Sequence, residues 1–177
     1  MSEYVTIARP YAQAAFDFAK ERNAVDQWLS MIGFMKEVVT EDSVSETIKA
    51  SNNSASILEM LKVISDGYVD EYFLNFLRQI VENERLAVMP DILEEFVRLK
   101  DEDENILKAQ VVSVEKLPKN EMDKIQTFLE DKYQSSVVLS NIIDTDILGG
   151  VVIKTPKEVI DASIRSRIDE LTDVLKS

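Results

Sequence analysis

The stretch Leu93–Ser113 reads LEEFVRLKDEDENILKAQVVS, and its two ends follow different hydrophobic patterns. Before the acidic run Asp101–Glu104, apolar residues are spaced as on one face of an α-helix. After it, Leu107, Ala109 and Val111 alternate with polar residues, as in a half-buried β-strand. The four like charges mark either the solvated end of a helix or a domain edge. The change of pattern favours a domain edge, with one domain over residues 1–105 and another over residues 106–177.

Residues 1–105 predict a six-helix bundle with short connections. The expected helices cover approximately residues 7–21, 25–39, 43–50, 57–64, 70–83 and 90 into the acidic run. Pro10 fits only near the start of the first helix, so this helix is expected to begin just before it. Asp66-Gly67 is expected to end the fourth helix, because glycine tolerates a positive φ.

Residues 106–177 predict a smaller α+β domain. Strands are expected over Leu107–Val111, Val137–Ile143 and Ile147–Ile153, with an amphipathic helix through Met122–Leu129. Asp144–Asp146 reads as a hairpin turn that leads into the third strand. A last helix, capped by Asp161, is predicted from the spacing of Ile160, Ile164, Ile168, Leu171 and Leu175. The predicted fold class is mainly α, an N-terminal six-helix bundle followed by a smaller α+β C-terminal domain.

The composition excludes several classes of function. The 177 residues include 20 Lys plus Arg, 33 Asp plus Glu, no His and no Cys. A Ser-His-Asp triad, a thiol nucleophile and a zinc site of the common kind are therefore excluded. The net charge of -13, of which -11 belongs to residues 1–105, argues against nucleic acid as the partner. No targeting peptide is expected at the start, and no apolar run approaches the ~20 residues of a membrane-spanning helix, so no direct membrane insertion is expected.

No metal and no cofactor are predicted. Asp144 and Asp146 are interpreted as turn formers rather than metal ligands, and four glycines leave little from which to build a phosphate loop. Gly149-Gly150 indicates a bend, a bulge or a close approach of the backbone. Arg165 and Arg167 either contact an anion or acidic partner or belong to a solvated helix face.

The helical part contains more apolar surface than one small bundle core needs. The alanines of the first helix recur on one side, and the fifth predicted helix has apolar groups on two sides. These alanines are Ala8, Ala12, Ala15 and Ala19. The two helices either form a groove for an amphipathic helix of another chain or contribute to a thick core, and composition leaves both open.

Three motifs resemble a known family. They are Ala8-Arg-Pro-Tyr-Ala12 followed by Ala14-Ala-Phe16-Asp, then Asn83-Glu-Arg-Leu86, then Gly149-Gly-Val-Val-Ile153 with Asp161-Ala-Ser-Ile-Arg-Ser-Arg167. In this order the chain resembles the delta subunit of bacterial F-type ATP synthase, whose mitochondrial counterpart is the oligomycin sensitivity-conferring protein. The family-motif residues are thus Gly149, Gly150, Asp161, Ser163, Arg165 and Arg167.

The resemblance implies a non-catalytic stator subunit at the cytoplasmic face of the bacterial inner membrane, held there through the complex. The implied partners are the N-terminal helix of an alpha subunit of the catalytic head and the b subunits of the peripheral stalk. The implied groove lies between the first and fifth helices, lined by Tyr11, Ala12, Ala15, Asn75, Phe76, Gln79 and Asn83. The residues alone leave two alternatives, a small-molecule-binding regulatory module and a hydrolase that uses only carboxylates.

Overall fold

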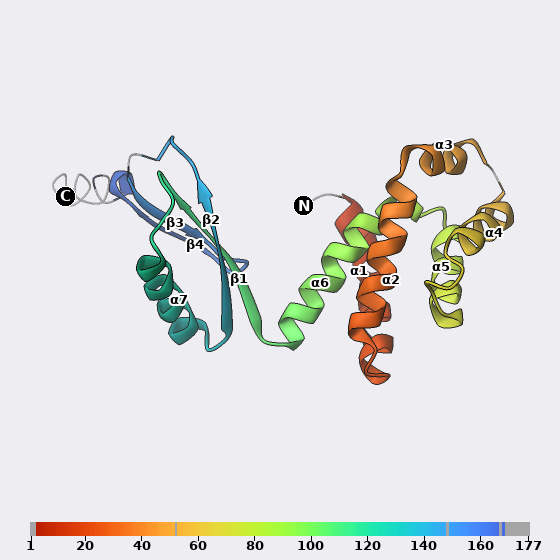
Figure 1. Ribbon diagram of the computed structural model, residues 1–177, viewed down its shortest axis with the longest axis horizontal. Helices are drawn as coiled ribbons and strands as arrows, with labels where there is room; N and C mark the ends of the chain where they lie inside the picture. Colours follow the sequence, from red (N-terminus) through yellow and green to blue (C-terminus); the bar gives the residue numbers. More distant parts are fainter. Residues whose placement is uncertain (1–2, 52, 148, 167, 169–177) are drawn as a thin grey trace. The chain divides into compact units, whose positions relative to one another are not determined.

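The computed structural model describes residues 3–51, 53–147, 149–166 and 168. It divides the chain into two compact units, Met1–Lys100 and Asp101–Ser177. The first unit is helical, and the second combines a four-stranded sheet with a helix (Figure 1). The predicted fold class, mainly α with an α+β C-terminal part, is confirmed. The division between the units falls at the first residue of the acidic run.

The helical unit is formed by short segments that follow one another closely. They are α1 (Glu3–Glu21), α2 (Val25–Thr40), α3 (Asp42–Ala50), α4 (Ser54–Ile64), α5 (Glu71–Glu82), the 3-10 turn η1 (Leu86–Val88) and α6 (Met89–Asp103). Side-chain caps explain two of these starts. Asn53 Oδ1 accepts a hydrogen bond from the amide of Ala55 (3.0 Å), and Asp70 Oδ1 accepts one from the amide of Phe73 (2.8 Å).

The first helix begins earlier than the sequence predicts, at Glu3, so that Pro10 lies inside it. A proline in this position removes one backbone hydrogen bond and costs about 3 kcal/mol. On both sides of Pro10 the helix packs into the core, since Ile7 packs against the core and Ala8 and Ala12 are fully buried. Packing along this part of α1 therefore offsets the local cost of Pro10.

The core of the helical unit is aromatic around one tryptophan. The ring centroid of Trp28, on α2, lies 5.5 Å from that of Phe73 and 5.7 Å from that of Phe76, both on α5. The ring of Phe18, on α1, lies 5.3 Å from Trp28 on another side. Trp28 thus joins α1, α2 and α5.

The second unit contains β1 (Ile106–Ser113), α7 (Lys119–Tyr133), β2 (Ser136–Ile143), β3 (Gly150–Lys154) and β4 (Val159–Ser163). The strand order is β2-β1-β3-β4, with β1 and β2 parallel and the other pairs antiparallel. The helix α7 connects the parallel pair and lies along one face of the sheet (Figure 1). Its Leu129 is fully buried among Leu107, Val111 and Val137.

The predicted hairpin at Asp144–Asp146 is wrong. Strands β2 and β3 lie on opposite sides of β1, so the segment between them crosses the end of β1 instead of returning beside β2. The Asp144 amide donates to the carbonyl of Ser113 at the end of β1 (2.9 Å). Asp144 Oδ1 accepts from the Asp146 amide (3.0 Å), so the local turn exists, but the third strand begins only at Gly150.

The predicted start of the last helix is also wrong. Ile160 and Asp161 belong to β4, where Ile160 pairs with Ile153 of β3. Pairing with β3 overrides the helical spacing of the isoleucines, because a strand also places residue 160 on its inner face. Helical conformation begins at Ile164. Leu171 and Leu175 lie outside the described residues.

Candidate partner-binding surface

Helices α1 and α5 lie side by side and run in opposite directions. Near the end of α1, the ring centroid of Phe18 lies 5.4 Å from that of Tyr72 at the start of α5. The guanidinium carbon of Arg85, just after α5, lies 6.0 Å from the ring centroid of Tyr11 in the middle of α1. The predicted pairing of these two helices is therefore present.

The alanines of α1 face inward. Ala8, Ala12 and Ala19 are fully buried, and Ala15 is 2% exposed. Their small side chains let α1 approach the rest of the bundle closely. Ala12 and Ala15 were expected to line a groove, but their burial leaves neither of them a surface that a partner helix can contact.

The accessible face of α1 lies beside this alanine row. Tyr11 and Phe18 are half-buried, and Ala14 between them is exposed. Tyr4 and Ile7 extend the same row by two turns, because they precede Tyr11 by seven and four residues. The residues of this row follow one another at steps of three and four, so the row is present in the sequence. The alanine row beside it has the same spacing, and the sequence alone does not show which of the two rows is accessible.

The matching face of α5 is aromatic at its centre and polar at its margin. Phe76 is half-buried and Tyr72 is 50% exposed. Asn75, Gln79 and Asn83 are exposed. Asn83 Nδ2 donates to the carbonyl of Gln79 at the end of α5 (2.6 Å), so one predicted side chain also caps its own helix.

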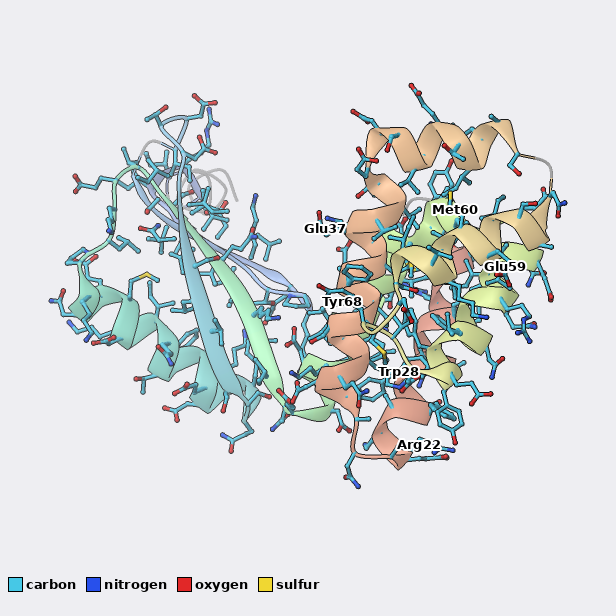
Figure 2. The ribbon with its side chains drawn as sticks, turned by 45° about the vertical axis from the view of Figure 1, so that its right-hand side comes forward. Arg22, Trp28, Glu37, Glu59, Met60 and Tyr68 are labelled. Carbon is cyan, nitrogen blue, oxygen red and sulfur yellow. The ribbon has the colours of Figure 1, made fainter. Side chains whose placement is uncertain are left out.

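We call this region the α1–α5 surface and define it by the accessible residues of both helices. They are Tyr4, Ile7, Tyr11, Ala14 and Phe18 of α1, with Tyr72, Asn75, Phe76, Gln79 and Asn83 of α5. Of the predicted lining, Tyr11, Asn75, Phe76, Gln79 and Asn83 are thus accessible on neighbouring helices. Trp28 is buried directly behind Phe18 and Phe76. Figure 2 shows Trp28 toward the end of the bundle where α1 leads into α2, with Arg22 at that end.

The two glycines of the C-terminal motif have a structural explanation. Gly149 and Gly150 have φ values of 126° and 80°, which side chains rarely adopt. A Cβ on Gly150 would lie 2.5 Å from the carbonyl oxygen of Ala162, because Gly150 pairs with Ser163 of β4. The glycines therefore allow β4 to pair closely with the first residue of β3.

The rest of the motif joins β4 to the helical segment after it. Asp161 Oδ1 accepts from the Ser163 amide (2.8 Å), and hydrogen bonds from Ser163 lower the pKa of Asp161 below its ordinary value. Ser163 Oγ accepts from the amide of Ser166 (3.2 Å), so Ser163 caps the segment in place of the predicted Asp161. Arg165 is exposed, and Arg167 lies outside the described residues.

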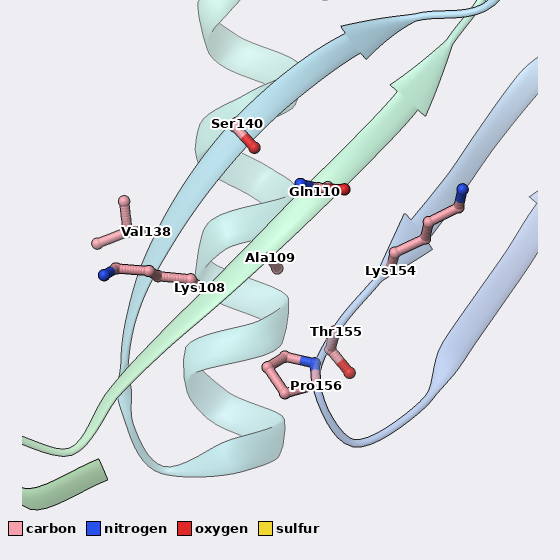
Figure 3. Close-up of a pocket in the computed structure, with 8 residues that line it drawn as sticks. All are labelled: Lys108, Ala109, Gln110, Val138, Ser140, Lys154, Thr155 and Pro156. Carbon is pink, nitrogen blue, oxygen red and sulfur yellow. The ribbon is translucent and has the colours of Figure 1, made fainter. Parts of the chain in front are cut away.

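A cavity of about 440 Å³ lies over β1, β2 and the end of β3 (Figure 3). Its polar side chains are Lys108, Gln110, Ser140, Lys154 and Thr155. Lys108 is half exposed and its Nζ pairs with Asp101 (2.6 Å), while Gln110, Ser140 and Lys154 are exposed. A small-molecule site needs polar groups held in a closed pocket, which this exposed lining does not provide.

The carboxylates whose pKa is shifted do not match the general acid of a hydrolase, and the described carboxylates form no metal site. Hydrogen bonds from Lys132 and Tyr133 lower the pKa of Glu158, and a hydrogen bond from Ser43 lowers that of Glu41. A general acid needs the opposite shift. Within residues 3–51, 53–147, 149–166 and 168, no three acidic side chains gather to hold a metal ion.

No helix in the described part of the chain is both long and apolar enough to cross a bilayer.

Comparison with known proteins extends these observations to the whole chain. The family described as ATP synthase delta (OSCP) subunit matches residues 7–175. The chain is 41% identical to ATP synthase subunit delta of Edwardsiella ictaluri and 42% identical to that of Tolumonas auensis, over 100% of each chain. Its fold is similar to a chain of the Toxoplasma gondii mitochondrial ATP synthase hexamer, with a TM-score of 0.64, 19% identity and coverage of 100% and 99% of the two chains.

The family match spans both structural units, which agrees with the three motifs in the sequence. The predicted resemblance is therefore confirmed, and the two alternatives, a carboxylate-only hydrolase and a small-molecule-binding regulatory module, give way to a non-catalytic stator role in the synthase. This chain belongs to the ATP synthase delta (OSCP) subunit family.

Proposed function

We propose that the α1–α5 surface binds the N-terminal helix of an alpha subunit of the catalytic head. The observation that supports this most directly is the row of accessible apolar and aromatic side chains on two adjacent antiparallel helices. An amphipathic helix buries its apolar face in such a place by presenting residues at steps of three and four. The exposed amides of Asn75 and Gln79 offer hydrogen bonds at the margin.

We further propose that the second unit binds the b subunits of the peripheral stalk, at the cytoplasmic face of the inner membrane. The separation into two compact units supports a division of labour between two partners. A chain that engages head and stalk together gains retention through effective concentration, even when each interface is modest. In this role the protein holds the head still while the central shaft turns.

The first test titrates the full chain with a peptide of the first 25 residues of the alpha subunit. Trp28 is the only tryptophan and lies behind Phe18 and Phe76, so binding is expected to change its fluorescence. Calorimetry gives an independent affinity, and a peptide of the same composition in scrambled order is the control. Absence of both signals with the native peptide contradicts the proposal.

A pair of charge substitutions locates the binding face. Ala14→Glu places a carboxylate in the centre of the α1–α5 surface, and Thr6→Glu adds the same charge on an exposed part of α1 about 140° around the helix from Tyr11. We expect Ala14→Glu to weaken peptide binding at least about 30-fold, roughly the cost of facing an apolar helix with an unpaired charge. Thr6→Glu should bind as the parent does.

Binding of the soluble part of b tests the second half of the proposal. The Ala14→Glu variant is expected to keep its affinity for b while it loses the alpha peptide. In membranes, the same variant should reduce ATP-driven proton pumping more than ATP hydrolysis. A catalytic head that the stator does not hold still can hydrolyse ATP without driving the rotation that pumps protons. If pumping and hydrolysis fall together, the variant has affected the head itself.

A further inference from the structure

Two arginines flank the α1–α5 surface, and both contact aromatic rings. The guanidinium carbon of Arg22 lies 4.5 Å from the ring centroid of Phe18 and 4.3 Å from that of Tyr72. The guanidinium carbon of Arg85 lies 6.0 Å from the ring centroid of Tyr11. A guanidinium that stacks on a ring contacts it with its flat face, and the N–H groups at its edge stay available to donate hydrogen bonds.

The charge environment makes these contacts unusual. Residues 1–105 carry 21 acidic and ten basic side chains. Within the described part of the chain, neither Arg22 nor Arg85 forms an ion pair with any of these carboxylates. By contrast, Glu95 is 7% exposed and pairs with both Arg9 and Arg98. Arg22 and Arg85 therefore place two positive charges, neither ion-paired within the described part of the chain, next to an apolar surface.

The backbone geometry at the ends of α1 and α5 fixes the position of each arginine. The amide of Ala24 donates to the carbonyl of Ala19 (2.8 Å) with Asn23 at φ 53°, which ends α1 around Arg22. The amide of Arg85 donates to the carbonyl of Ile80 (2.9 Å) with Glu84 at φ 57°. Both ends are Schellman motifs, so the same rigid cap places an arginine after each helix.

The antiparallel arrangement sets the distance between the two charges. Arg22 contacts Phe18 near the end of α1, and Arg85 contacts Tyr11, seven residues earlier on the same helix. From residue 11 to residue 18 a helix rises about 10 Å, which is close to two turns. A partner helix that lies along this surface presents side chains seven residues apart on the same face, since seven residues make close to two full turns.

We propose that the α1–α5 surface selects a helix with a carboxylate at each end of its apolar stripe, about seven residues apart, one paired with Arg22 and the other with Arg85. This inference rests on the proposed function of the surface and adds the register of its partner. The acidic domain repels a negatively charged helix elsewhere, so the two cations favour one position along the surface. Each arginine keeps its ring contact while its N–H edge donates to a carboxylate.

The test measures binding of the alpha-subunit peptide to the full-length chain and to Arg22→Gln and Arg85→Gln. Each variant is expected to bind about three- to tenfold more weakly, with a shallower dependence on salt. Arg78→Gln is the matched control, because Arg78 lies on α5 about 200° around the helix from Phe76. It should bind within about twofold of the parent. Arg→Lys at positions 22 and 85 should restore part of the loss.

A double-mutant cycle identifies the paired carboxylates. Each Glu or Asp of the peptide is changed in turn to Gln or Asn. Removing the carboxylate that pairs with Arg22 should weaken binding to the parent chain but should not weaken binding to Arg22→Gln any further. Variants that bind within twofold of the parent with unchanged salt dependence, or losses that simply add in every combination, overturn the inference and leave the proposed function intact. A peptide that fails to bind the parent chain refutes both.

Discussion

A glycine-to-alanine substitution at Gly150 tests how closely β4 must approach β3. An added Cβ would lie 2.5 Å from the Ala162 carbonyl oxygen and 2.9 Å from the Ser163 Cα. Both neighbours are backbone atoms of the paired strand, so they cannot move without breaking strand pairing. The backbone at Gly150 also has a φ of 80°.

The expected loss of unfolding free energy is the sum of two effects. Left-handed backbone costs a side chain about 1–2 kcal/mol, and overpacking against fixed atoms costs about 1–3 kcal/mol. Gly150→Ala should therefore lower the unfolding free energy of the second unit by about 2–5 kcal/mol.

Two other glycines separate these effects. Gly67 has a φ of 78° and no atom within 4 Å of an added Cβ, so Gly67→Ala should cost the helical unit only about 1–2 kcal/mol. Gly33 lies within α2, has no such φ and also has open space, so Gly33→Ala should stabilise by up to about 1 kcal/mol.

Urea unfolding distinguishes the units. Trp28 fluorescence reports the helical unit, and far-UV circular dichroism reports both. If Gly150→Ala is no more destabilising than Gly67→Ala, the proposed clash with β4 is wrong.

Three further substitutions probe the same structure. Glu84→Gly should stabilise the helical unit by about 0.5–1 kcal/mol, because Glu84 has a φ of 57°; urea unfolding followed by Trp28 measures this. Ala15→Glu should lower the helicity and the melting temperature of that unit, since Ala15 is 2% exposed, and a variant that melts like the parent would contradict its burial. Glu158→Gln should flatten the dependence of stability on pH below 4.5. Hydrogen bonds from Lys132 and Tyr133 lower the pKa of Glu158 from 4.5 in the folded protein. The stability that the ionised Glu158 contributes is therefore present above pH 4.5 and is lost as the pH falls through the folded pKa. An unchanged acid transition would show that these hydrogen bonds do not stabilise the fold.

Local sequence signals predicted what local chemistry determines. Asp66-Gly67 was predicted to end the fourth helix, and α4 ends at Ile64, just before it, with Gly67 at a φ of 78°. The strand alternation around β1 was also visible, since one face of β1 packs on α7. These elements need no information from distant parts of the chain.

Long-range packing decided the rest. The helical spacing of Ile160 and Ile164 could not show that Ile160 pairs with Ile153, and Asp144–Asp146 could not show that β2 and β3 flank β1. On α1, the alanine row and the aromatic row are neighbours on one helix, and only contacts with other helices show which of them is buried. The resemblance implied a groove between two helices that are neighbours in the structure, but two of the side chains expected to line it, Ala12 and Ala15, are buried.

The arginine–ring contacts have a consequence for a protein that would work beside a flow of protons. Arginine stays charged at any pH that a cell reaches, and the chain contains no histidine, the side chain that ordinarily titrates near neutrality. The described pKa shifts move Glu158 and Asp161 downward and Lys132 upward, all away from neutral pH. Acidification or alkalinisation of the compartment by a unit or two would therefore leave the charges of Arg22 and Arg85 unchanged.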